Sequence, residues 1–229
     1  MISATHRVLA TALALISLLI ASGTAWAAEP VVLVVGDSLS AAYGLREQSG
    51  WVHLLRERLT NHKPRYQVIN ASISGDTTRG GLTRIDKALK QFNPQVVIIE
   101  LGGNDGLRGM PLNGMRSNLD SMVTAVKQAN AKPLIVGVEM PPNYGPLYTK
   151  QFLQVFQDVG RKHDVRVVPS IFAGFSEKRD FFQPDGIHPV ASAQPMILET
   201  VWKELAPLLE EKPASAFSGR RVANPQSVR

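Results

Sequence analysis

The 229-residue sequence contains no cysteine. This absence excludes disulfide bonds, thiolate metal sites, a cysteine nucleophile and lipid attachment at an N-terminal cysteine. Charged residues make up only 19% of the chain, whereas hydrophobic residues reach 44%. This balance is ordinary for a globular protein and excludes disorder throughout, collagen and coiled coil. The length fits a single domain with a full hydrophobic core.

The N-terminus carries the pattern of a secretory signal peptide. Met1–Arg7 holds one Arg and no acid, Val8–Ile20 is an apolar run with small residues interspersed, and Ala25-Trp26-Ala27 has the A-x-A form of a cleavage site. An uncleaved membrane anchor is the alternative, because about 20 apolar residues can span a bilayer. Small and polar residues lower the apolarity where an anchor would continue. We therefore expect residues 1–27 to be removed near Ala27 and the mature chain to be exported, to the periplasm or beyond, without a stable membrane anchor.

Positive charge is concentrated at the two ends of the chain. The formal net charge is +6, but residues 211–229 hold four basic residues and one acid, and residues 28–210 carry only +2. This small surplus, without a cluster of base-stacking aromatics, argues against a nucleic-acid partner. The apolar pattern stops at Lys212, so we expect a basic, disordered tail over residues 211–229. The single domain is predicted over residues 28–210.

Apolar runs without polar alternation indicate buried strands. The longest are Pro30–Gly36, Val96–Leu101 and Leu134–Val138, with shorter versions at Tyr66–Asn70 and Arg166–Pro169. Continuous apolarity is typical of parallel strands that are covered on both faces. Helical spacing of apolar residues occurs between these runs and after the last one, with a final helix expected to begin near Pro195. The alternation predicts an α/β fold with a five-stranded, doubly wound parallel sheet.

Ligands bind beyond the carboxyl ends of the strands in such a sheet, so the residues after each strand are the candidates for chemistry. Asp37 and Ser38 follow the first strand, on a tight turn that we expect to lead into a helix N-terminus, where a developing negative charge is favoured. A helix N-cap is the alternative for this pair. The α/β-hydrolase elbow does not match, because Ser40 stands where its second glycine is required.

Two further strands end in groups that can donate hydrogen bonds. Gly75 follows the second strand and lets the backbone approach a ligand closely, although Asp76 and Thr77 after it can equally cap the next helix. Gly102-Gly103-Asn104 follows the third strand. The Asn104 amide donates without carrying charge, which suits an oxyanion hole, and a plain Gly-Asn turn is the alternative.

The last candidate is Asp185-Gly186-Ile187-His188 near the C-terminus. Asp185 stands three residues before His188, so a loop can fold the carboxylate back onto the imidazole, fixing its tautomer and stabilising the imidazolium. A solvated loop histidine is the alternative. No cluster of residues with metal-ligand spacing accompanies it, so we expect no metal site.

Together these four blocks resemble the SGNH, or GDSL, hydrolase family. They stand here as Gly36-Asp37-Ser38-Leu39, Gly75-Asp76-Thr77, Gly102-Gly103-Asn104-Asp105 and Asp185-Gly186-Ile187-His188, and the resemblance extends over about all of residues 28–210. The strings NASISGDT, ELGGNDGLRG and DGIHP are similar to a bacterial periplasmic branch described as multifunctional acyl-CoA thioesterase, lysophospholipase and arylesterase. The resemblance implies a three-layer α/β/α fold with flavodoxin-like strand order.

The resemblance also implies roles for individual residues. It makes Ser38 the nucleophile, His188 the base and Asp185 the residue that orients it, with Asp37 holding the blocks together. The oxyanion donors would be the backbone N–H groups of Ser38 and Gly75 and the side chain of Asn104. Residues at the edge of the acyl groove would include Gly106, Leu107, Met110, Pro142 and Tyr144. No metal or cofactor is implied.

These residues predict a serine hydrolase that cleaves ester or thioester bonds of acyl or aryl substrates through an acyl-enzyme on Ser38. The apolar stretch Met140–Tyr148, with two tyrosines, suits an alkyl or aryl group, although a proline-stiffened surface loop is the alternative. A carbohydrate or peptidoglycan O-deacetylase on the same fold is the second hypothesis. A non-catalytic ligand-binding protein is the third. We expect a small-molecule or lipid ester or thioester as substrate, and a monomer.

Overall fold

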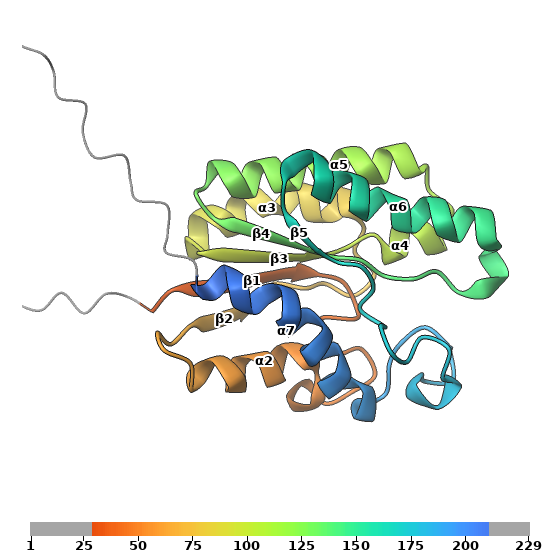
Figure 1. Cartoon of the computed structure of the whole chain (residues 1–229), viewed down its shortest axis with the longest axis horizontal. Helices are drawn as coiled ribbons and strands as arrows, with labels where there is room; N and C mark the ends of the chain where they lie inside the picture. Colours follow the sequence, from red (N-terminus) through yellow and green to blue (C-terminus); the bar gives the residue numbers. More distant parts are fainter. Residues whose placement is uncertain (1–28, 211–229) are drawn as a thin grey trace, which may run out of the picture.

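The computed structural model describes residues 29–210, which form one α/β domain around a parallel sheet (Figure 1). Its strands are β1 (Val31–Gly36), β2 (Gln67–Asn70), β3 (Val96–Glu100), β4 (Lys132–Val136) and β5 (Arg166–Val168). Every neighbouring pair is parallel, and the order across the sheet is β2-β1-β3-β4-β5. The predicted five-stranded parallel sheet with flavodoxin-like order is therefore confirmed.

The two central strands explain why the apolar runs are continuous. Val32–Val35 in β1 and Val96–Ile99 in β3 are fully buried. A strand with helices on both faces has no solvent side, so alternation with polar residues would place unpaired polar groups in the core. Burial of these branched side chains on both faces stabilises the sheet.

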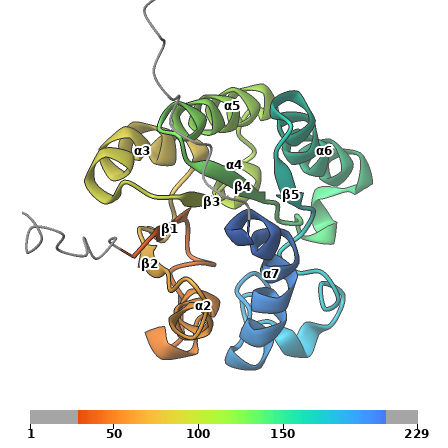
Figure 2. The same cartoon turned by 60° about the vertical axis from the view of Figure 1, so that its left-hand side comes forward.

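Helices cover both faces of the sheet in three layers (Figure 2). One face carries α3, α5 and α6, and the other carries α2 and α7. Their bounds are α2 Trp51–Thr60, α3 Thr78–Phe92, α4 Gly103–Leu107, α5 Leu112–Gln128, α6 Pro146–His163 and α7 Gln194–Glu210. Short 3₁₀ turns lie at Glu47–Ser49, Pro142–Tyr144, Arg179–Phe181 and Ala191–Ala193. The last helix begins one residue before Pro195, as predicted.

The segment after β1 differs from the prediction, because no α-helix begins at Ser38. Instead the chain makes successive turns in which Ala41 N–H donates to the Asp37 carbonyl and Tyr43 N–H to the Ser38 carbonyl, at 2.9 and 3.1 Å. Ala42 then adopts a positive φ of 58°, a left-handed conformation that stops a helix. Neither the expected helix N-terminus nor an N-cap role for Ser38 is present.

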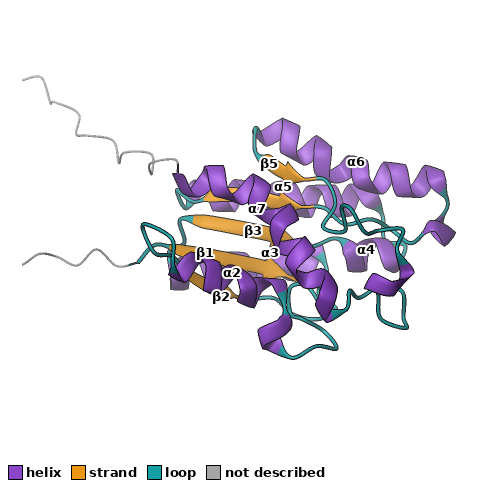
Figure 3. Cartoon of the chain, turned by 60° about the horizontal axis from the view of Figure 1, so that its bottom comes forward, coloured by secondary structure: helices purple, strands orange, loops and turns teal. Residues whose placement is uncertain are grey.

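The loops that follow the strands gather at one end of the sheet, where the short helix α4 also lies (Figure 3). This is the edge predicted to carry the chemistry. Within residues 29–210, none of the helices has the length and apolarity needed to cross a bilayer. The predicted signal peptide and basic tail, residues 1–27 and 211–229, lie outside the described residues.

Candidate active site

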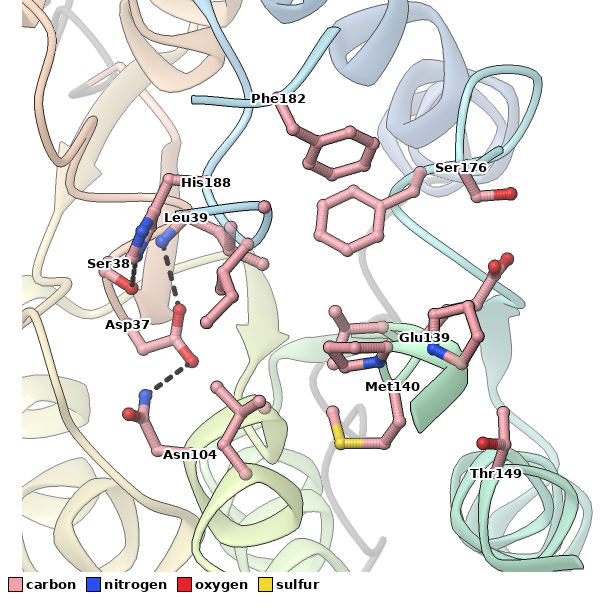
Figure 4. A pocket seen from close by; sticks show the side chains of 18 of the residues that line it. Asp37, Ser38, Leu39, Asn104, Glu139, Met140, Thr149, Ser176, Phe182 and His188 are labelled. Carbon is pink, nitrogen blue, oxygen red and sulfur yellow. Dashed lines mark hydrogen bonds between the residues drawn. The ribbon is translucent and has the colours of Figure 1, made fainter. Parts of the chain in front are cut away.

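Ser38, His188 and Asp185 form a hydrogen-bonded chain at the carboxyl edge of the sheet, and Figure 4 shows the contact between Ser38 and His188. Ser38 Oγ lies 2.8 Å from His188 Nε2, although the two residues are 150 positions apart in sequence. His188 Nδ1 lies 2.7 Å from Asp185 Oδ2. Because the carboxylate accepts the Nδ1 proton, Nε2 of a neutral ring is left free to accept the hydroxyl proton. This arrangement can activate a serine hydroxyl.

A tight loop fixes the Asp185 carboxylate. Its Oδ1 accepts hydrogen bonds from the N–H groups of Ile187 and His188, at 2.9 and 3.0 Å, while Oδ2 faces the imidazole. Gly186 makes this return possible with a φ of 72°. Partial burial raises the pKa of Asp185, but hydrogen bonds from the His188 ring and these two backbone groups hold its pKa below the usual value. The carboxylate therefore stays ionised while the ring changes charge.

Two residues that the sequence analysis did not single out brace the His188 loop against the Ser38 loop. The Tyr43 ring lies 4.5 Å from the His188 ring, centroid to centroid. Gln183 Nε2 donates to the Tyr43 carbonyl at 2.9 Å and to the Pro189 carbonyl at 3.2 Å. These contacts join segments far apart in sequence, and no local pattern marks them.

Three potential donors lie around Ser38. Within the described residues, the N–H groups of Ser38 and Gly75 donate to no other protein group. Gly75 has a φ of 81°, a conformation that favours glycine. Asn104 lies at the start of α4, and its Nδ2 donates one proton to Asp37 Oδ2 at 3.1 Å, leaving the second N–H unused. The structure thus brings all three predicted oxyanion donors to the same edge.

Asp37 links the turn that holds Ser38 to the loop that holds Asn104. Its Oδ1 accepts from Leu39 N–H at 3.0 Å and its Oδ2 from Asn104 Nδ2 (Figure 4). The side chain is buried, and burial is the main cause that raises the pKa of Asp37 to about 6. Hydrogen bonds from Leu39 and Asn104 and the nearby His188 act in the opposite direction. Asp37 therefore titrates close to neutrality.

Glu100 lies beneath this turn and was not singled out from the sequence. The residue is fully buried at the end of β3, and its Oε2 accepts from Ser40 Oγ at 2.7 Å and Asp37 N–H at 3.4 Å. Burial, and then the charge of Asp37, raise the pKa of Glu100 well above its usual value. Burial therefore disfavours the charged form of Glu100. An acidic residue closing the apolar run VVIIE was the sequence signal that could have marked it.

A large cavity of about 1210 Å³ opens beside Ser38 and His188. Its walls are mostly apolar, with Met140 and Phe182 on opposite sides in Figure 4. Charged side chains also line the cavity, on Asp37, Glu139, Lys150, Glu177 and Arg179. A cavity of this size and lining suits an apolar acyl or aryl group.

The predicted groove residues divide into two sets. Leu107 and Pro142 line the cavity. Gly106, Met110 and Tyr144 do not line it, which corrects the expectation for these three. Gly106 is buried, with the position of a Cβ only 2.5 Å from the Met140 sulfur, and the Tyr144 hydroxyl donates to the Leu107 carbonyl at 2.8 Å. Gly106 and Tyr144 thus support the wall from behind, whereas no contact explains a role for Met110.

Within residues 29–210, no group of three or more His, Asp or Glu side chains has the arrangement needed to hold a metal ion. The groups that gather around Ser38 are a hydroxyl, an imidazole, carboxyls and amide donors. This set matches the requirements of acyl transfer through a serine nucleophile.

Comparison with known proteins agrees with this chemistry. The model of the GDSL-like lipase/acylhydrolase family matches residues 34–194. Esterase TesA of Pseudomonas aeruginosa is 47% identical over 186 residues, which cover 81% of this chain and 92% of that protein. Thioesterase 1/protease 1/lysophospholipase L1 of Escherichia coli is 39% identical over 183 residues, 80% of this chain and 86% of that protein. The crystal structure of the psychrotrophic esterase EstA from Pseudoalteromonas, inhibited by monoethylphosphonate, has a TM-score of 0.74 at 38% identity and covers 80% of this chain and 100% of its own.

The chain belongs to the GDSL-like lipase/acylhydrolase family. The fold and the enzyme class predicted from the sequence, a hydrolase of the GDSL family, are thereby confirmed. Family membership gives the enzyme class but not the part that each residue plays. Those parts are inferred below from the contacts in this chain.

The raised pKa of Asp37 predicts a specific dependence of stability on pH. A carboxyl whose pKa is higher in the folded chain binds its proton more tightly there, so its contribution to stability is present below pH 4 and is lost as the pH rises through about 6. Relative to an Asp37→Asn variant, the wild type should lose about 2 kcal/mol of unfolding free energy between pH 4 and pH 7.5. Urea denaturation of both proteins at the two pH values measures this difference. A difference between the proteins that stays constant with pH would contradict the assignment.

Proposed function

We propose that this GDSL hydrolase cleaves acyl or aryl esters and thioesters through a covalent acyl-enzyme on Ser38. The observation that carries the proposal is the continuous chain from Ser38 Oγ through His188 to Asp185, at 2.8 and 2.7 Å, beside an apolar cavity. These distances allow proton transfer without rearrangement of the loops.

The reaction proceeds by two acyl transfers. Neutral His188 takes the Ser38 proton on Nε2 while Oγ attacks the carbonyl carbon, and the carbonyl oxygen becomes an oxyanion. Protonated His188 then donates to the leaving oxygen or sulfur as the bond to it breaks. A water molecule, deprotonated by His188, attacks the acyl-enzyme, and the acid is released as Ser38 regains its proton.

The oxyanion is held by the N–H groups of Ser38 and Gly75 and by the second N–H of Asn104. Ser38 and Gly75 belong to loops that leave the sheet edge, and Asn104 to α4 directly after β3, so their dipoles are oriented before the substrate arrives. Asp185 stabilises the imidazolium by direct contact. Asp37 orients Asn104 through its Oδ2 and the Ser38 turn through its Oδ1.

The apolar cavity favours an acyl or aryl substrate over an acetylated glycan. A glycan presents many hydroxyl groups, which need polar partners when they are buried. The cavity walls supply apolar side chains instead, among them Leu39, Leu107, Val138, Met140 and Ile187. The names of the relatives, esterase, thioesterase and lysophospholipase, support the same substrate classes.

The first experiment tests the nucleophile. Purified protein is assayed against acyl-CoAs, lysophospholipids, aryl esters and acetylated sugars, with Ser38→Ala as the blank. We expect turnover of at least one of the first three classes, complete loss in Ser38→Ala, and labelling of Ser38 by a fluorophosphonate in the wild type only. A folded wild-type protein that is neither labelled nor active would support a binding protein instead, and a preference for acetylated sugars would support the deacetylase.

A second experiment tests the oxyanion hole. Asn104→Ala removes one uncharged donor while leaving the triad in place, so kcat should fall by about 10²–10³-fold with little change in KM. Circular dichroism and thermal unfolding of the variant serve as the control for folding. A variant that is folded and retains the wild-type rate would remove Asn104 from the mechanism.

We further propose that the enzyme is exported and acts outside the cytoplasm as a monomer. The tripartite N-terminal pattern and the A-x-A site before Ala28 support export. The full-length chain expressed in its bacterial host should yield a mature protein whose first residue is Ala28, as determined by N-terminal sequencing of the periplasmic fraction. Recovery of an uncleaved chain from membranes would favour the anchor. Light scattering of the mature protein gives its oligomeric state.

A further inference from the structure

The guanidinium of Arg84 joins the two loops that carry the backbone donors. Arg84 lies in α3, and its side chain is 21% exposed. Nε donates to Asp76 Oδ2 at 2.8 Å, Nη1 to the Ala71 carbonyl at 2.5 Å, and Nη2 to the Gly36 carbonyl at 3.3 Å. One planar group thus contacts the end of β1 and two points of the loop after β2.

These three acceptors stand close in sequence to the donors. Gly36 immediately precedes the turn that holds Ser38, and Asp76 immediately follows Gly75. The first part of the loop after β2 is tied to β1 by backbone hydrogen bonds, from Ala71 N–H to the Val34 carbonyl at 2.8 Å and from Ile73 N–H to the Gly36 carbonyl at 3.0 Å. Beyond Ile73 this loop makes no further backbone bond to β1 within the described residues. The Arg84–Asp76 ion pair, together with the bond from Asp76 N–H to the Ile73 carbonyl at 3.0 Å, holds the part of the loop that contains Gly75.

Local sequence makes room for this ion pair. A Cβ at Gly80 would lie 1.7 Å from Asp76 Oδ1, so only glycine at that position leaves space for the carboxylate. The same Oδ1 accepts from Thr77 N–H at 3.0 Å, which leaves Oδ2 directed at Arg84. The carbonyl of Gly75 is held separately, by Arg108 Nη2 at 2.8 Å. Gly75 is therefore held both at its own carbonyl and through the side chain of the residue that follows it.

We propose that Arg84 is a positioning residue for hydrolysis, which sets the separation between the Ser38 and Gly75 N–H groups of the oxyanion hole. The inference rests on the proposed function of this site. Arg84 does not line the cavity, so it acts through Gly36 and Asp76 rather than on the substrate. Its loss should therefore weaken binding of the transition state and leave binding of the ground state unchanged.

Arg84→Lys tests this role. A lysine ammonium keeps the charge, but it cannot reach all three acceptors, which are arranged around the planar guanidinium of arginine. We expect kcat for an aryl ester to fall by about 10–100-fold, since a displacement of about 1 Å in a reacting geometry can cost 10²-fold, with KM changed less than about two-fold. Arg79→Lys, the same substitution at an exposed position of the same helix, is the matched control and should retain the wild-type rate.

Inhibitor binding separates positioning from general loss of structure. A trifluoromethyl ketone forms an oxyanion when Ser38 adds to it, so its affinity for Arg84→Lys should fall by the same factor as kcat. The affinity for a product carboxylic acid should not change. If both affinities fall together, or if neither falls, Arg84 has no specific part in the oxyanion hole.

Double variants identify the path of the effect. Arg84→Lys combined with Asp76→Asn should be no slower than the slower single variant, because both disturb the same set of contacts around position 84. When Arg84→Lys is combined with Asn104→Ala, the two losses in kcat should multiply, because the Asn104 donor does not depend on Arg84. If Arg84→Lys does not fold, Asp76→Asn alone carries the kinetic and inhibitor tests. An inactive wild type that is not labelled at Ser38 would refute the proposed function, whereas an active wild type with a fully active, folded Arg84→Lys would refute only the role of Arg84.

Discussion

The site depends on the position of β1 between β2 and β3. Parallel neighbours end at the same edge of a sheet, so the loops after these three strands have to meet. The register pairs Val34 with Asn70 on one side and Gly36 with Glu100 on the other. The loops carrying Ser38, Gly75 and Asn104 therefore start from fixed points on a buried, rigid sheet. The contribution of the fold to catalysis is this preorganisation, which costs no rearrangement when substrate binds.

Features whose causes are local could be predicted from the sequence. Continuous apolar runs gave the five strands, because burial on both faces is a property of each run by itself. Asp185 and His188 are three positions apart with a glycine between them, so the loop could be inferred from the spacing. The prediction of a helix after Ser38 was wrong. It rested on the preference of Asp and Ser for helix N-caps, which is weak, and the left-handed conformation of Ala42 and the turns around it outweigh that preference.

Features that arise from long-range contacts could not be predicted in the same way. Ser40 and Glu100 are 60 residues apart, and Arg84 and Gly36 are 48 apart. The spacing of either pair in the sequence has no periodicity that would connect them. Gly106 and Tyr144 are likewise neighbours in sequence of residues that line the cavity. Only the packing of the folded chain decides that these two residues themselves do not line it. Sequence patterns place a residue at an edge, whereas the three-dimensional structure decides what it contacts.

Two buried carboxyls beneath the nucleophile are costly to the fold, which raises the question of what they do there. Glu100 supports the turn by accepting hydrogen bonds from Ser40 Oγ and Asp37 N–H. An ionised Asp37 accepts from Leu39 and Asn104 at once, which a protonated carboxyl does less well. The attraction of the nearby His188 lowers the pKa of Asp37 and so favours this ionised form. The burial of Asp37, although unfavourable for stability, therefore joins the Ser38 turn to Asn104.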